Sequence, residues 1–207
     1  MSKLPVFRSA GRCLAQHGEG QDRIKIIRSD SRKVSAVLAD GAGDVIGGDR
    51  AANLVVNTLA EYFPEDFAAL FDQILELDRQ LKLDPLAGFS TVVSVYTDGS
   101  HFSGAAVGDS DALLIRDGKV SNLAPEKELK PLLGDGEAFP SVFSGSLEDS
   151  VLLLCSDGLS KYIAASDVVD ICTQHRDPNT IVDNLIDVVS LPDGELQDDV
   201  SVIVISE

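Results

Sequence analysis

Residues Ser90–Arg116, STVVSVYTDGSHFSGAAVGDSDALLIR, decide the fold class of this chain. Apolar and β-branched residues fill three short runs of this stretch, and the turn sequences Thr97-Asp98-Gly99-Ser100 and Gly108-Asp109-Ser110 separate them. Such runs, bounded by turn residues, predict strands that are joined by hairpins. The predicted strands lie near Ser90–Tyr96, Phe102–Val107 and Ala112–Arg116. We therefore expect an antiparallel meander in the middle of the chain.

Helix-like and strand-like segments are grouped, not alternating, on both sides of this meander. Apolar residues recur at helical spacing in the predicted helices Gly47–Phe63 (ended by Pro64), Phe67–Leu83, Ser166–Gln174 and Asn179–Val189. Further strands are predicted at Ile24–Arg28, Val34–Ala39, Val151–Cys155 and Val200–Ile205, and residues 121–149 are predicted to form a loop with one or two short strands. Grouped helices and hairpin-linked strands indicate an α+β protein. We expect a single domain over residues 1–207, built as a four-layer αββα sandwich: two antiparallel β-sheets flanked by helix pairs.

The chain is strongly acidic, since 34 Asp and Glu residues against 17 Lys and Arg residues give a formal net charge of −17. This charge repels nucleic-acid phosphate and anionic lipid, so we expect neither nucleic acid nor a membrane as a partner. Residues 1–16 lack the apolar stretch of a signal peptide, and no run approaches the ~18 apolar residues of a transmembrane helix. Cys13, Cys155 and Cys172 match no zinc pattern and are interpreted as reduced. These features predict a cytoplasmic protein.

Four aspartates share one setting, a turn at the end of an apolar strand. They are Asp40, Asp109, Asp157 and Asp198. An Asp-Gly pair alone most often marks a turn, which is how we interpret Asp117-Gly118. A carboxylate at the end of a buried strand is costly unless its charge is offset, and several together would repel one another. Divalent cations are the natural neutralising partner, and oxygen-only ligation selects Mg²⁺, Mn²⁺ or Ca²⁺ over zinc.

These aspartates belong to an ordered set of six motifs that spans nearly the whole chain. The motifs are Gln21-Asp22, DGAG (Asp40–Gly43), GFSTVV (Gly88–Val93), AAVGDSDALL (Ala105–Leu114), LLLCSDGLS (Leu152–Ser160) and DDVSVIVI (Asp198–Ile205). The set resembles the metal-dependent type 2C (PPM) Ser/Thr protein phosphatases. The early Gln-Asp pair, with His17 five residues before the Asp, is most similar to the compact bacterial branch of that family. Each motif alone is common, but six in the same order are specific.

The resemblance implies a site for two Mg²⁺ or Mn²⁺ ions per chain. Asp40 would bridge the two ions, and the carbonyl of Gly41 would ligate one of them. Asp157 and Asp198 would hold the other ion, and Asp22 would act through water on the Gly41 side. No side chain would be the nucleophile, because water activated between the two ions attacks phosphorus in line. The cations would also offset charge on the phosphoryl oxygens.

Four positions depart from the family pattern or concern a further ion. Asp109 matches a residue that is tied to a weaker third metal in bacterial members. Lys161 stands where a second support of that third metal is usual, which puts the third ion in doubt, and it could contact phosphate or be solvated. His17 replaces an Arg that commonly contacts substrate phosphate, and it is a surface residue in the alternative interpretation. Ala42 occupies a position that is His in some members, so the proton donor to the leaving group must lie elsewhere.

We therefore expect a phosphoserine/phosphothreonine protein phosphatase that acts on a phosphorylated protein and opposes a bacterial Ser/Thr kinase. One alternative keeps the chemistry and changes the substrate to a small phosphorylated metabolite. The other is a catalytically weak homologue that binds a phosphorylated partner as a regulator. The substitutions at His17 and Lys161 keep this last alternative open, whereas the presence of the main ligand aspartates argues against it.

Overall fold

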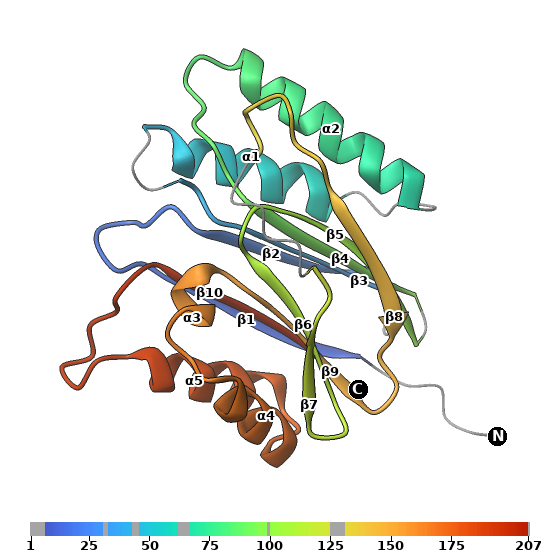
Figure 1. Cartoon of the computed structure of the whole chain (residues 1–207), viewed down its shortest axis with the longest axis vertical. Helices are drawn as coiled ribbons and strands as arrows, with labels where there is room; N and C mark the ends of the chain where they lie inside the picture. The colour runs from blue at the N-terminus through green and yellow to red at the C-terminus, as the bar shows by residue number, and fades with distance from the viewer. Residues whose placement is uncertain are drawn as a thin grey trace.

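The molecule is built in four layers, two β-sheets face to face with a pair of helices outside each (Figure 1). The computed structural model describes residues 7–30, 33–42, 46–61, 67–98, 100–124 and 131–206. The two sheets have five strands each within these ranges, and every strand pair is antiparallel. The expected αββα sandwich is therefore confirmed.

The first sheet has the strand order β2-β3-β4-β5-β8. Its strands are β2 (Arg23–Arg28), β3 (Val34–Ala39), β4 (Val92–Asp98), β5 (His101–Val107) and β8 (Ser141–Ser146). All six residues of β3 are buried, because this strand is covered on both faces. Its side chains alternate between the faces, as a period of two requires: Val37 points to the helices and Leu38 to the other sheet.

The second sheet has the strand order β1-β10-β9-β6-β7, so the last strand of the chain lies between β1 and β9. Its strands are β1 (Arg8–Leu14), β6 (Asp111–Arg116), β7 (Lys119–Asn122), β9 (Ser150–Cys155) and β10 (Val200–Ser206). Strand β10 is buried along its whole length. Leu152, Leu154 and Ile203 face Leu38 and the first sheet across the central core.

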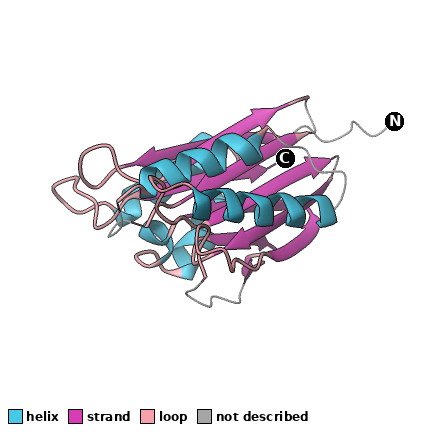
Figure 2. Ribbon diagram, turned by 90° about the horizontal axis from the view of Figure 1, so that it is seen from above, coloured by secondary structure: helices cyan, strands magenta, loops and turns pink. Residues whose placement is uncertain are grey.

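One helix pair covers each outer face, as the spacing of apolar residues predicted. The helices are α1 (Gly48–Ala60), α2 (Phe67–Leu83), α4 (Ala165–Gln174) and α5 (Pro178–Val189). Figure 2 shows the pair α1 and α2 lying over the strands of the first sheet. Helix α5 begins with Pro178 in its first turn, and the Asp177 carboxylate caps it by accepting the N–H of Thr180 at 3.1 Å. None of the helices in the described ranges is both long and apolar enough to cross a lipid bilayer.

Three local predictions need correction. Gly108-Asp109-Ser110 is not a hairpin turn, because β5 and β6 belong to different sheets and this segment crosses between them. Strand β1 was missed, since its sequence RSAGRCL has few large apolar residues and owes its place to pairing with β10. A short helix, α3 (Asp157–Ser160), directly follows β9 and was also missed. The predicted helix end at Phe63 and Pro64 lies outside the described residues, as does Gly43 of the DGAG motif.

A buried carboxylate on helix α2 binds the backbone of the segment that precedes strand β8 of the first sheet. Asp78 of α2 is 3% exposed and accepts three backbone N–H bonds, from Gly134 at 2.7 Å, Gly136 at 3.0 Å and Ala138 at 3.1 Å. Both glycines have positive φ, so the backbone curls around the carboxylate. The segment before β8 is thereby held against α2, with Leu132 close by in sequence.

Candidate metal centre

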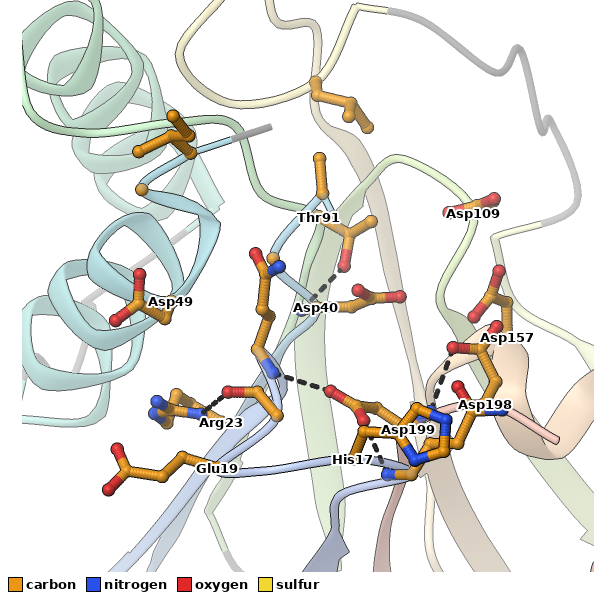
Figure 3. A pocket seen from close by; sticks show the side chains of 18 residues that line it. His17, Glu19, Arg23, Asp40, Asp49, Thr91, Asp109, Asp157, Asp198 and Asp199 are labelled. Carbon is orange, nitrogen blue, oxygen red and sulfur yellow. Dashed lines mark hydrogen bonds between the residues drawn. The ribbon is translucent and has the colours of Figure 1, made fainter. Parts of the chain in front are cut away.

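A cavity of about 900 Å³ lies where strand ends and connections of the two sheets meet (Figure 3). Carboxylates dominate its wall: Glu19, Asp40, Asp49, Asp109, Asp157, Asp198 and Asp199. The other lining residues are Gln16, His17, Gly20, Gln21, Arg23, Gly41, Ala42, Ile46, Gly47, Thr91 and Leu132. Both sheets therefore contribute to one acidic cavity.

Asp40 is the residue directly after β3, and its backbone is fixed by the start of β4. Its N–H donates to Oγ1 of Thr91 at 3.1 Å, while its carbonyl accepts the N–H of Thr91 at 2.8 Å and the hydroxyl of Ser90 at 3.0 Å. Gly41 follows in a bridge to Ser90. A Cβ at Gly41 would lie 2.5 Å from the carbonyl of Gly48, so only glycine allows α1 to begin this close to the site.

Three carboxylates from distant parts of the chain converge. Oxygens of Asp40, Asp109 and Asp157 all lie within 4.8 Å of one another, and all three side chains are half-buried. Asp109 reaches this position because its segment crosses between the sheets. Asp157 is the first residue of α3, directly after β9. The family resemblance predicts Asp40, Asp157 and Asp198 as the central group and Asp109 as an outlying residue, whereas the structure places Asp109 within 4.8 Å of Asp40 and Asp157.

Asp198 lines the same cavity beside this group. Burial raises its pKa, and the nearby Asp157 charge adds to that effect. The next residue, Asp199, has a structural role that the sequence motifs do not indicate. Its carboxylate accepts the N–H groups of Gln16 at 2.8 Å and Gln21 at 2.6 Å, which ties the β1–β2 loop to the start of β10. The sequence shows the adjacent pair Asp198-Asp199, but it does not indicate that Asp199 binds backbone N–H groups of the β1–β2 loop.

Asp22 lies behind the cavity wall. It is 2% exposed, and its Oδ2 atom is buried with no hydrogen-bond partner among the described residues. Burial raises the pKa of Asp22 to about 7. Burial also raises the pKa of Asp40 to about 9, with the charges of Asp22, Asp157 and Asp109 adding to the effect.

The two predicted phosphate contacts differ in their surroundings. His17 is exposed on the β1–β2 loop and lines the cavity. Lys161, one turn after Asp157, forms an ion pair with the Asp157 carboxylate, and this contact raises the lysine pKa. The Arg23 guanidinium donates to the backbone carbonyls of Gly20 and Asp22, at 3.1 and 2.6 Å. Among the residues described around this cavity, few cations thus offset the clustered carboxylates.

These residues fit a site for hard divalent cations. The converging side chains offer oxygen atoms only, which is the donor set that Mg²⁺ and Mn²⁺ prefer. Burial and mutual repulsion oppose ionisation of Asp22, Asp40 and Asp198, and a divalent cation would reverse that cost.

A family model described as Stage II sporulation protein E (SpoIIE) matches residues 30–206. This chain belongs to the SpoIIE family. The SpoIIE match places it among phosphatase domains of the type 2C kind, so the family predicted from the six motifs is confirmed. A search among curated proteins found no match.

Solved structures share the fold over essentially the full chain. The phosphatase Stp1 from Staphylococcus aureus has a TM-score of 0.84 at 19% identity and covers 100% of this chain and 97% of its own. PppA, a regulatory component of T6SS in Pseudomonas aeruginosa, has a TM-score of 0.80 at 21% identity, with 98% of each chain covered. The catalytic domain of PstP, solved with two manganese ions, has a TM-score of 0.77 at 21% identity, covering 97% of this chain and 98% of its own. At these identities the likeness establishes the fold.

The raised carboxyl pKa values predict how stability depends on pH without metal. A carboxyl whose pKa is higher in the folded state contributes stability below its unfolded pKa of about 4, and this contribution is lost as pH rises through the folded value. With folded values of about 7 for Asp22 and about 9 for Asp40, the metal-free protein should lose stability steadily from about pH 5 to about pH 9. Thermal denaturation in chelator measures this, and the Asp40→Asn variant should show a flatter profile. Equal profiles for the two proteins would contradict the assignment to this cluster.

Proposed function

We propose that this SpoIIE-family chain is a metal-dependent phosphoserine/phosphothreonine protein phosphatase that uses two Mg²⁺ or Mn²⁺ ions. The observation that carries the proposal is the approach of the Asp40, Asp109 and Asp157 carboxylates to within 4.8 Å in an oxygen-only site. The family assignment and the fold that the chain has in common with bacterial Ser/Thr phosphatases support it.

The proposed ligand set follows the sequence-based roles. Asp40 and the Gly41 carbonyl would bind one ion. Asp40 would also bind the other ion, together with Asp157 and Asp198. Asp22 would act through water. The hydrogen bonds from Ser90 and Thr91 to the Asp40 backbone support a rigid central ligand. The position of Asp109 supports a role for it beside Asp40 and Asp157, including the weaker third ion.

The bound cations would supply an activated water and offset the charge on the phosphoryl oxygens. The chain's own residues would hold the substrate around them. The exposed His17 imidazole is placed on a cavity-lining loop from which it could donate to a phosphoryl oxygen. The Asp199 hydrogen bonds to Gln16 and Gln21 support a fixed position for that loop. Ala42 has no ionisable group, so it cannot protonate the leaving group.

The direct test is release of p-nitrophenol from p-nitrophenyl phosphate with Mn²⁺, repeated with chelator. We expect metal-dependent turnover, together with calorimetric binding of about two Mn²⁺ per chain. Higher kcat/KM on phosphopeptides than on small phosphorylated metabolites would support a phosphorylated protein as the substrate. Turnover that persists unchanged in chelator would overturn the proposal.

The ion pair at Asp157 favours a second candidate, a weakly catalytic homologue that binds a phosphorylated partner as a regulator. Lys161 contacts a proposed metal ligand, so a cation must displace it from Asp157 before that carboxylate can coordinate. We expect Lys161→Gln to bind Mn²⁺ about three- to tenfold more tightly, since a competing charge is removed. If Lys161 also contacts substrate phosphate, KM for a phosphopeptide should rise in the same variant.

Calorimetry and steady-state kinetics on the Lys161→Gln variant separate these effects. Tighter Mn²⁺ binding with higher turnover would mean that Lys161 restrains a competent phosphatase. Unchanged Mn²⁺ affinity would show that the lysine does not compete at the site. High-affinity binding of a phosphopeptide without hydrolysis, in wild type and variant alike, would favour the regulator.

A further inference from the structure

Besides Asp199, which holds the β1–β2 loop, two carboxylates on the cavity wall have no part in the proposed metal site. Glu19 lies in the β1–β2 loop and Asp49 in the first turn of α1, and both are exposed. Among the residues that the structure describes, neither forms an ion pair. Figure 3 shows both on the side of the cavity opposite Asp157 and Asp198. They therefore present free negative charge to whatever flanks a bound phosphate.

The charge of the described cavity wall would remain negative with two divalent cations bound. Among the described lining residues, seven carboxylates against the guanidinium of Arg23 give a formal balance of −6, and two divalent cations would leave −2. Lys161, paired with Asp157 nearby, reduces this to −1. A substrate phosphate then brings its own negative charge. Acidic groups elsewhere on a substrate would be repelled, while basic groups close to the phosphate would be attracted.

An exposed aliphatic side chain also borders the cavity. Ile46, just before α1, lines the cavity and is 97% exposed, the most exposed large apolar residue described. Leu132, on the segment that Asp78 anchors, lines the same cavity. A nearly fully hydrated isoleucine gains free energy when an apolar group covers it. Negative charge and apolar surface thus occur together at one cavity, an arrangement that complements a basic and aliphatic polypeptide segment.

We propose that Glu19, Asp49 and Ile46 select phosphoprotein substrates in which Lys or Arg and a large aliphatic residue flank the phosphorylated Ser or Thr. This inference rests on the proposed phosphatase function and names its substrate class. The two carboxylates contact the basic residues, and Ile46 packs against the aliphatic residue. Acidic phosphosites and polyanionic small phosphates are poor substrates for the same reason.

The test uses the full chain with Mn²⁺ and three phosphoserine peptides of equal length. One has Lys and Leu beside the phosphoserine, one has Lys and Ser, and one has Glu and Leu. A contact between exposed charges is worth about two- to fivefold, so kcat/KM should be ~10-fold higher for the Lys-Leu peptide than for the Glu-Leu peptide at low salt. This ratio should shrink at high salt because the charges are solvent-exposed.

Substitutions at Glu19, Asp49 and Ile46 test whether these residues cause the preference among peptides. The double variant Glu19→Gln, Asp49→Asn should lower the Lys-Leu to Glu-Leu ratio at least ~3-fold and leave p-nitrophenyl phosphate turnover unchanged. Ile46→Ser should remove about a threefold advantage of the Lys-Leu peptide over the Lys-Ser peptide. The matched control Asp187→Asn, an exposed carboxylate on α5 away from the cavity, should change neither ratio.

Two results would overturn the inference while leaving the phosphatase function intact. One is equal kcat/KM for the basic and acidic peptides; the other is a preference that the Glu19→Gln, Asp49→Asn variant retains in full. Hydrolysis of p-nitrophenyl phosphate but of no peptide would reject both the inference and the protein substrate of the proposed function, and would leave metal-dependent phosphomonoester hydrolysis standing. Absence of hydrolysis on every compound, with Mn²⁺ bound, would remove the proposed function and the inference together.

Discussion

Asp40→Asn should lower Mn²⁺-dependent turnover of p-nitrophenyl phosphate by at least ~10²-fold, comparable to loss of a major electrostatic element of an active site. The substitution keeps the shape of the side chain and removes the charge at the centre of the carboxylate group. In chelator, the variant should be as stable as the wild type or more stable. The reason is that burial and the charges of Asp22, Asp157 and Asp109 oppose ionisation of Asp40.

Asp117→Asn is the matched control, because Asp117 also precedes a glycine at a turn. Asp117 adopts positive φ in the β6–β7 turn and lies outside the acidic cavity, so activity and stability should stay near wild type. Thermal denaturation in chelator and steady-state rates decide between two roles for Asp40. If Asp40 only shapes its turn, Asp40→Asn would lose stability and retain nearly normal activity, and the metal assignment would have to be abandoned.

Asp78→Ala should produce the largest loss of stability of any single change considered for this protein. It leaves the N–H groups of Gly134, Gly136 and Ala138 without their acceptor at a site that is 3% exposed. Orphaned buried donors cost about 1–3 kcal/mol each, partly offset here by relief of a buried charge, so we expect a loss of ~3 kcal/mol. For a chain of this length, this corresponds to a Tm lower by about 6–12 °C.

Asp72→Ala controls for the helix itself, since Asp72 is exposed on the same helix and should change stability by less than ~0.5 kcal/mol. Calorimetric denaturation of both variants gives the comparison. Because the anchored segment carries Leu132 at the cavity wall, Asp78→Ala should also raise KM in the molecules that remain folded. A Tm within a degree or so of wild type would show that water replaces the carboxylate, contrary to this account.

Local sequence patterns were sufficient for most of the elements. The predicted limits of the helix Phe67–Leu83 and the strand Val34–Ala39 match the structure. Each limit is set by apolar spacing and by flanking turn residues, which act within a few positions of the chain. The order of these elements was also enough for the α+β class and the two-sheet sandwich. The motifs further identified Asp40, Asp157 and Asp198 as residues that line one cavity.

Only the tertiary structure decided how distant segments share that cavity. The sequence Gly108-Asp109-Ser110 has the composition of a hairpin turn, yet it crosses between sheets and brings Asp109 to Asp40 and Asp157. The loop at Gln16 is held by Asp199, 183 positions later in the chain.

The place of β1 beside β10 likewise depends on tertiary packing. The physical reason is that periodicity reports which face of an element is apolar. It does not report which other helix or sheet packs against that apolar face, because this pairing depends on packing and charge summed over the whole fold.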